Sequence, residues 1–300
     1  MSARKPLLFA TILSAVLLAM TSLASAGAYP AVIAYGDSLS DNGNLYALDG
    51  GTNPLSPPYY MGRFSNGPVT VEQLTTDLGL SQANLHDFAI GGATTGSGPS
   101  GIGMLNQVAG TLTAVTPLLP SSLVLVWGGP NDFLDFGFST ATADAAVANL
   151  INIVDALQGA GANHILVPGM PDLGLTPEIR ALGPGYVAAA TFLSQYFNTK
   201  LLSELPTGVK YYDTFGFMNN VVAHPDAYGF TDVTDQCLVG STPCSNETQY
   251  LFWDHIHPTT TADAFLARQF ESAVVPEPST FLMLGTGLVG LAGMLRRKMF

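Results

Sequence analysis

Three residue types that could together perform nucleophilic catalysis stand far apart in this chain. Ser38 follows the apolar run 31–34 within Gly36-Asp37-Ser38, and Asp254 and His257 lie three positions apart near the other end. A serine hydroxyl is a poor nucleophile until an imidazole takes its proton, and that imidazole needs a carboxylate on its other nitrogen. We therefore expect Ser38 to be a nucleophile, His257 its general base and Asp254 the group that orients the base.

Two further polar segments could stabilise the negative charge that forms when such a serine attacks a carbonyl. Gly91-Gly92 follows the segment 84–90, and Asn131 follows the apolar run 122–127. Backbone N–H groups and an Asn amide can each stabilise an oxyanion by roughly 3 kcal/mol. We expect Ser38, Gly92 and Asn131 to supply these donors, with Gly91 as the alternative to Gly92.

Each of these residues also has a plain structural interpretation. The Gly-Asp-Ser tripeptide and Gly92 could merely form turns, and Asn131 could cap a helix. His257 precedes Pro258 and could belong to a helix start. His255 is the nearest rival base, and we expect its side chain to point away from that of His257.

The elements that would have to position these side chains alternate between strands and helices. Such alternation predicts one parallel sheet covered by helices on both faces, with the polar segments gathered where the strands end. The stretch 43–68 is rich in Gly, Pro, Asn and Tyr and is expected to be a functional surface loop. The predicted strands are 31–34, 84–90, 122–127, 164–167 and 209–212, and the predicted helices are 69–78, 103–115, 141–157, 185–202 and 260–273.

Both ends of the chain differ in composition from the middle. Residues 1–26 carry a basic start, an apolar stretch and a small-residue cleavage site, so they are predicted to be a signal peptide removed by signal peptidase. Residues 275–300 contain Pro276-Glu277-Pro278, the short apolar run 281–295 and a terminal basic cluster. This tail resembles the PEP-CTERM sorting signal of Gram-negative bacteria. The alternative is a plain membrane anchor, although the run is shorter than the roughly 20 residues that span a bilayer comfortably.

The resemblance of the tail implies removal by an exosortase-type protease after transient association with the inner membrane. The predicted domain, 27–274, would then lie in the periplasm, at the cell surface or outside the cell. This middle part carries five of the ten basic residues but 21 of the 22 acidic ones, a net charge of −16. Such a charge repels phosphate backbones and argues against nucleic-acid binding.

The two cysteines, Cys237 and Cys244, lie close together in a polar segment. In an exported protein such a pair is expected to form a disulfide, with two free thiols as the alternative. A zinc site is not expected, because no nearby histidines complete four ligands.

Taken in order, the polar segments resemble the motif blocks of the GDSL-type SGNH hydrolases, in the lipase-like branch. The resemblance covers about residues 31 to 270 and implies a flavodoxin-like three-layer α/β/α fold, a Ser38–His257–Asp254 triad, an oxyanion hole and no cofactor or metal. The second block usually opens with Asn, whereas this chain has Asp87. The matching blocks are 36–44, 87–94, 129–132 and 254–259, and the segment 62–67 also resembles one common in that branch.

The expected activity is that of an exported serine esterase or lipase that cleaves carboxylic esters through an acyl-enzyme on Ser38. Two alternatives remain open from the sequence. One is deacetylation of an extracellular polysaccharide, and the other is a non-catalytic surface or matrix-binding protein on the same scaffold. The sequence does not distinguish hydrolysis from acyl transfer to an alcohol, and it does not set the acyl preference or the oligomeric state.

Overall fold

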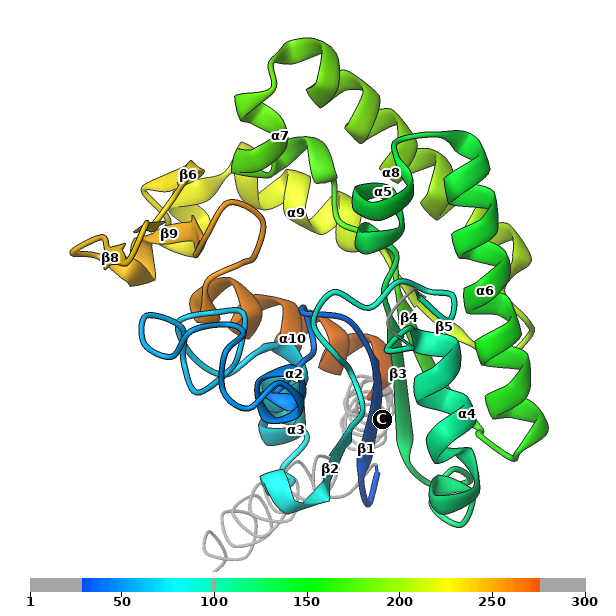
Figure 1. The fold of residues 1–300 in the computed structure, drawn as a ribbon. Coiled ribbons are helices and arrows are strands. Elements are labelled where there is room, and N and C mark those ends of the chain that lie inside the picture. Colours follow the sequence, from blue (N-terminus) through cyan, green and yellow to red (C-terminus); the bar gives the residue numbers. More distant parts are fainter. Residues whose placement is uncertain (1–28, 99–100, 276–300) are drawn as a thin grey trace, which may run out of the picture.

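The centre of the protein is a parallel sheet of five strands in the order β2-β1-β3-β4-β5 (Figure 1). The computed structural model describes residues 29–98 and 101–275. Every strand pair in this sheet is parallel, which confirms the predicted α/β class and strand number. The strands are β1 Val32–Gly36, β2 Leu85–Asp87, β3 Leu123–Trp127, β4 His164–Pro168 and β5 Lys210–Tyr212.

Alternate side chains of the central strands enter two separate cores, because successive residues of a strand point to opposite faces. Val32 and Ala34 of β1 pack with Leu74 and Phe270, whereas Ile33 and Tyr35 join the core on the other face. All residues of β1 and β3 are buried, as expected for inner strands covered on both sides. The sheet is therefore the middle layer of three.

Helices form the two outer layers. Helices α3 and α10 cover one face of the sheet, and α4, α6 and α8 cover the other (Figure 1). The long helices begin and end within a few residues of their predicted bounds, and capping explains some starts: Ser139 and Thr259 accept hydrogen bonds from the first turns of α6 and α10. The helices are α2 Asn44–Leu48, α3 Thr70–Asp77, α4 Met104–Val115, α5 Pro130–Phe136, α6 Thr140–Gly159, α7 Pro177–Ala181, α8 Pro184–Glu204, α9 Thr214–Ala223 and α10 Thr260–Val274, with 3-10 turns η1 Gln82–Asn84, η2 Leu173–Leu175, η3 Pro225–Tyr228 and η4 Glu247–Gln249.

Some segments contain more structure than the sequence predicts. Helix α2 lies inside the stretch 43–68, α5 follows β3 directly, and α9 follows β5. The region before the last helix also holds β6 Asp232–Gln236 paired with β9 Tyr250–Phe252, and a small hairpin of β7 Leu238–Val239 and β8 Thr242–Pro243. Conversely, β2 has only three residues, fewer than the predicted 84–90.

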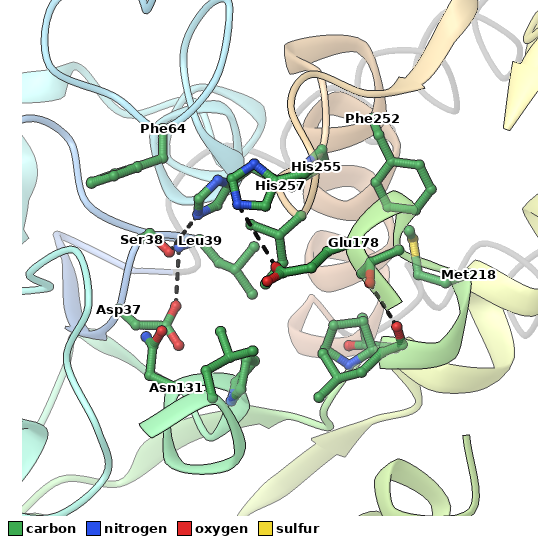
Figure 2. A pocket seen from close by; sticks show the side chains of 18 of the residues that line it. Asp37, Ser38, Leu39, Phe64, Asn131, Glu178, Met218, Phe252, His255 and His257 are labelled. Carbon is green, nitrogen blue, oxygen red and sulfur yellow. Dashed lines mark hydrogen bonds and ion pairs between the residues drawn. The ribbon is translucent and has the colours of Figure 1, made fainter. Parts of the chain in front are cut away.

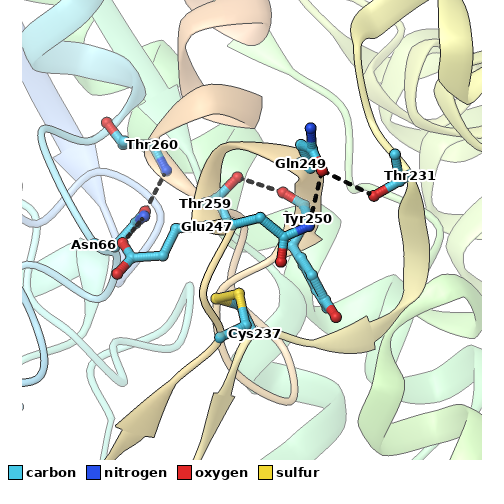
Figure 3. The surroundings of a disulfide bond; sticks show 10 residues. Asn66, Thr231, Cys237, Glu247, Gln249, Tyr250, Thr259 and Thr260 are labelled. Carbon is cyan, nitrogen blue, oxygen red and sulfur yellow. Dashed lines mark hydrogen bonds between the residues drawn. A yellow bond between two sulfur atoms is a disulfide. The ribbon is translucent and has the colours of Figure 1, made fainter.

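The region before α10 contains a disulfide bond between Cys237 and Cys244, with an S–S distance of 2.04 Å (Figure 3). Asn66 connects this region to the segment after α2. Its side-chain amide donates to Glu247 at 2.8 Å, and its carbonyl oxygen accepts from the backbone N–H of Thr260 at 2.8 Å (Figure 3). Asn66 thereby links the segment around Glu247 to Thr260, the first residue of α10.

The predicted signal peptide and nearly all of the predicted sorting tail lie outside the described residues. The domain bounds 27–274 therefore stay a prediction. Within the parts of the chain that are described, no helix is both long and apolar enough to cross a membrane.

Candidate active site

The turn after β1 places Ser38 at the carboxyl-terminal edge of the sheet. Backbone N–H groups of Ser40 and Asp41 bond back to the Asp37 carbonyl at 3.1 and 3.0 Å, which closes a tight turn around Ser38. A side chain at Gly36 would meet the carbonyl oxygen of Trp127 at 2.5 Å, so only glycine fits where β1 leaves the sheet. The serine is thus carried on a rigid support beside the end of β3.

His257 and Asp254 lie on the turn between β9 and α10. Asp254 Oδ1 accepts the backbone N–H groups of Ile256 and His257 at 2.9 and 2.7 Å, which fixes both the turn and the carboxylate. Its Oδ2 lies 2.8 Å from His257 Nδ1, and His257 Nε2 lies 2.8 Å from Ser38 Oγ (Figure 2). The structure therefore joins the three residues that the sequence singled out into one hydrogen-bonded chain.

The charged forms of Asp254 and His257 stabilise each other. Burial alone would raise the pKa of Asp254, but the charge and hydrogen bond of His257, together with a hydrogen bond from Tyr59, hold it below its ordinary value. Burial alone would lower the pKa of His257, but the Asp254 carboxylate raises it. The carboxylate therefore stays ionised at neutral pH and fixes the imidazole tautomer that has its lone pair toward Ser38.

Two residues that line the pocket carry backbone N–H groups that could bind an anion. Among the described residues, the N–H groups of Ser38 and Gly92 have no hydrogen-bond partner, and both residues line the same pocket. The Gly91 N–H instead donates to Asp41 Oδ2 at 2.7 Å, so it is already engaged. Gly92 has a φ of 76°, a conformation that glycine adopts without strain. This geometry favours Gly92 over Gly91 as a donor.

Asn131 lies in the first turn of α5, directly after β3, and lines the pocket beside Ser38 (Figure 2). Gly129, with a φ of 127°, and Pro130 form the turn from strand to helix. The structure thus brings the side-chain amide of Asn131 to the same pocket as the two free N–H groups. Such converging donors can stabilise a developing oxyanion.

A cavity of about 380 Å³ extends from the serine. Figure 2 shows Ser38 at one side of this pocket and Met218 and Phe252 at the opposite side, with Glu178 and His255 between them. Its lining is mostly apolar. The apolar residues are Leu39, Phe64, Trp127, Pro130, Leu134, Pro171, Leu173, Met218, Phe252, Ile256, Pro258 and Leu266.

His255 occupies a different position from that of His257. Its Nε2 lies 3.7 Å from Glu178 Oε2, and its side chain is 58% exposed. It lines the pocket, whereas His257 is the histidine that contacts both Ser38 and Asp254. The described residues contain no cluster of side chains suited to hold a metal ion.

Asp87 fits its unusual position by accepting hydrogen bonds. Its Oδ2 accepts from the N–H of Asn42 and its Oδ1 from that of Ala89, both at 3.0 Å. Burial raises its pKa well above the ordinary value. Asn44 donates its side-chain amide to the carbonyl oxygens of Asp87 and Ala89 at 3.1 and 2.9 Å, so the neighbouring turn is held by a different residue.

The comparisons with known proteins agree with this architecture. The family model for GDSL-like lipase/acylhydrolase matches residues 32–270. The chain belongs to this GDSL family. One relative is a phosphatidylcholine-sterol acyltransferase of Aeromonas hydrophila, which is 36% identical over 78% of this chain and 72% of its own length. Another is a GDSL esterase/lipase of Arabidopsis thaliana, which is 26% identical over 81% of this chain and 87% of its own length. A solved acetyl xylan esterase of Geobacillus stearothermophilus aligns over 85% of this chain and 100% of its own, with 16% identity and a TM-score of 0.47.

A second family model, the PEP-CTERM protein-sorting motif, matches residues 274–298 of this GDSL protein. The resemblance of the tail that the sequence indicated is thereby confirmed. The motif implies processing by an exosortase and indicates export in a Gram-negative bacterium.

One residue that contacts Asp254 was not indicated by the sequence. Tyr59 donates its hydroxyl to Asp254 Oδ2 at 2.7 Å, although it lies in the stretch 43–68. Neither spacing nor composition pairs this tyrosine with the distant aspartate. The aromatic and proline content of that stretch was the only signal, and it indicated no more than a functional loop.

Proposed function

We propose that this GDSL-family protein hydrolyses carboxylic esters through an acyl-enzyme on Ser38. The hydrogen-bonded chain from Ser38 through His257 to Asp254 carries the proposal. His257 Nε2 takes the hydroxyl proton while Ser38 Oγ forms a bond to the ester carbonyl carbon. The oxyanion is stabilised by the N–H groups of Ser38 and Gly92 and by the amide of Asn131.

The second half of the reaction uses the same residues. Protonated His257 returns its proton to the alkoxide as the C–O bond to the alcohol breaks, which leaves an ester on Ser38. Water then attacks the acyl carbon, His257 accepts its proton, and the carboxylic acid leaves as Ser38 regains its hydrogen. Asp254 holds the imidazole and compensates its positive charge throughout. The reaction needs no redox partner.

The apolar lining of the cavity supports esters with an acyl chain longer than acetyl. Each buried methylene contributes about 0.8 kcal/mol, so four extra methylenes add roughly 3 kcal/mol of binding over an acetyl group. The volume of about 380 Å³ lies within the range of small-ligand pockets. For these reasons a short- to medium-chain carboxyl ester is a better candidate than an acetylated polysaccharide.

Acyl transfer to an alcohol is a second candidate outcome at the same acyl-enzyme. It is supported by the 36% identity to a phosphatidylcholine-sterol acyltransferase. An alcohol in place of water would attack the acyl carbon with His257 as the same base. Adding glycerol or a sterol to the assay and measuring the new ester beside the free acid separates the two outcomes.

The proposed location of the domain follows from its ends. We propose that signal peptidase removes residues 1–26 and that the exosortase acts near Pro276-Glu277-Pro278. The polypeptide 27–274 would then be released to the periplasm, the cell surface or the medium. Mass spectrometry of the protein from its own cells would locate both cleavage sites.

The deciding experiment replaces Ser38 by alanine. Ser38→Ala should lower the hydrolysis of p-nitrophenyl octanoate at least about 10⁴-fold and abolish labelling by a fluorophosphonate. Ser40→Ala is a matched control, because the buried Ser40 hydroxyl has no partner among the described residues. Both variants should retain the circular dichroism of the parent protein. Near-normal turnover by folded Ser38→Ala would overturn the proposed function.

A further inference from the structure

A fourth side chain contacts the aspartate of the triad. The Tyr59 hydroxyl lies 2.7 Å from Asp254 Oδ2, the same oxygen that bonds to His257 Nδ1 at 2.8 Å. Asp254 is only 4% exposed, and its Oδ1 is already occupied by two backbone N–H groups. Without the tyrosine, Oδ2 of this buried carboxylate would keep His257 Nδ1 as its one donor among the described residues.

The position of this hydroxyl is fixed by packing on both sides of its ring. Tyr59 meets Trp253 edge to face at 6.3 Å and Phe64 at 6.3 Å, and the ring of Phe64 lies 5.1 Å from that of His257. Trp253 immediately precedes the triad aspartate. The Tyr59 ring is therefore held by contacts with Phe64, which packs on the imidazole, and with Trp253, which precedes Asp254.

The disulfide region supports the same contact from behind. Trp253 packs with Cys237 and Leu238, and Tyr59 packs against this cluster. The Leu238 N–H donates to the Trp253 carbonyl at 2.7 Å, which ties the small hairpin to the chain just before Asp254. The half-buried Tyr59, from a distant loop, thus reaches Asp254 while packed against the cluster of Cys237, Leu238 and Trp253.

We propose that Tyr59 is a positioning residue that holds the Asp254 carboxylate, and through it the His257 imidazole, in the orientation needed to activate Ser38. This inference rests on the proposed ester hydrolysis. The hydroxyl donates to the carboxylate, and Tyr59 is not among the residues that line the pocket. It restricts rotation of the carboxylate and shares its negative charge, so the imidazole keeps one direction toward Ser38 Oγ.

This role predicts an effect on the titration of the base. The carboxyl groups of Asp254, Asp37 and Asp263 raise the pKa of His257, and that of Asp254 is in direct contact with the ring. Removing the Tyr59 hydroxyl leaves the charge of Asp254 less compensated, and that charge then stabilises the imidazolium more strongly. The acid limb of kcat/KM should consequently move to higher pH. A purely structural role of the ring would leave the limb in place.

The test compares Tyr59→Phe with the parent protein and with Tyr60→Phe. Phenylalanine keeps the ring between Trp253 and Phe64 and deletes only the hydroxyl. Tyr60 is the matched control, because its side chain is exposed and stacks under Arg63 instead of contacting the triad. For Tyr59→Phe we expect kcat to fall about tenfold with little change in KM, and the acid limb to shift upward by about half a pH unit. Tyr60→Phe should match the parent in all three quantities.

Each outcome separates this proposal from the one on which it rests. If parent activity depends on Ser38 but Tyr59→Phe keeps the parent kcat and pH profile, the positioning role is wrong while the hydrolase stands. A lower kcat with an unmoved acid limb and a lowered melting temperature would make Tyr59 merely structural, and that too overturns the proposal. If Ser38→Ala itself stays active, the proposed hydrolase fails, whatever Tyr59 does.

Discussion

The side-chain amide of Asn131 donates a hydrogen bond of 3.0 Å to the backbone carbonyl oxygen of Ala93. This bond joins the turn after β3 to the turn after β2 and uses one of the two amide hydrogens. The other hydrogen remains to interact with a ligand in the pocket that Asn131 lines. Asn131 is thereby held in place by the segment that also presents the N–H of Gly92.

Replacing Asn131 by alanine tests its role as an oxyanion donor. Asn131→Ala should lower kcat about 100-fold or more, with little effect on KM, because the interaction is made chiefly in the transition state. Steady-state kinetics on p-nitrophenyl octanoate measures this split. Asn163→Ala is the control, since that exposed amide bonds to Pro120 away from the pocket. An unchanged kcat in Asn131→Ala would remove this residue from the oxyanion hole.

The pH dependence of turnover should follow His257. The Asp254 carboxylate raises the pKa of this imidazole above its ordinary value near 6.5. Only the neutral ring can accept the Ser38 proton, so kcat/KM should rise with pH and reach half its plateau above pH 6.5. A pH-stat assay with an uncharged aliphatic ester between pH 5 and 9 records the profile. A flat profile from pH 5 to 8 would contradict His257 as the base.

Shortening the apolar cavity should change the preferred acyl chain. Met218 is buried on α9 at the side of the pocket opposite to Ser38 (Figure 2). Met218→Trp should reduce kcat/KM for decanoyl esters at least about tenfold and leave acetyl esters nearly unaffected, since only the longer chain reaches that wall. Met218→Leu, which nearly conserves volume, serves as the control. Equal losses for all chain lengths would place the acyl chain elsewhere.

A buried carboxyl on α10 should make stability depend on pH. Asp263 on α10 accepts hydrogen bonds from the hydroxyls of Thr70 at 2.7 Å and Ser65 at 3.2 Å. Burial raises its pKa to about 8. Between the unfolded pKa near 3.8 and this value, the unfolded chain loses the proton that the folded protein keeps. Rising pH therefore weakens the fold through this group, and the contribution is complete only below about pH 4.

Asp263→Asn removes that titration while keeping a polar group of the same shape. From pH 5 to pH 8 the free energy of unfolding of the variant should gain roughly 2 to 4 kcal/mol relative to the parent. Urea unfolding at both pH values measures the difference, and the other buried carboxyls cancel because both proteins contain them. A difference that stays constant with pH would show that Asp263 is ionised in the folded protein.

The strand and helix pattern was predictable because each central element buries a continuous apolar run. The runs 31–34 and 122–127 lie within two residues of the bounds of the fully buried strands β1 and β3. The strands before α10 were not predictable, since β6 is mostly polar, β9 has only three residues, and the register between them shifts. β9 packs against α9 in a cluster that contains Met218, Val221, Leu251 and Phe252, and local periodicity does not encode such tertiary contacts.

The site was predictable where its residues lie in short motifs. Ser38, Gly92 and Asn131 lie two to five residues after strand ends and His257 lies before the last helix, and the topology brings such points together. Tyr59 has no such marker. Its contact with Asp254 depends on the conformation of a long loop, which is set by packing against Trp253 and Phe64.

The hydrogen bond between Tyr59 and Asp254 lies beyond the carboxyl-terminal ends of the strands. The described chain begins and ends near the opposite ends of the strands. Tyr29, just before β1, donates its hydroxyl to the backbone carbonyl of Val274 at the end of α10, at 2.9 Å. Tyr29 and Val274 therefore lie together near the start of β1, whereas Ser38 lies just beyond the other end of that strand. Neither end of the described chain contributes to the lining of the pocket at Ser38.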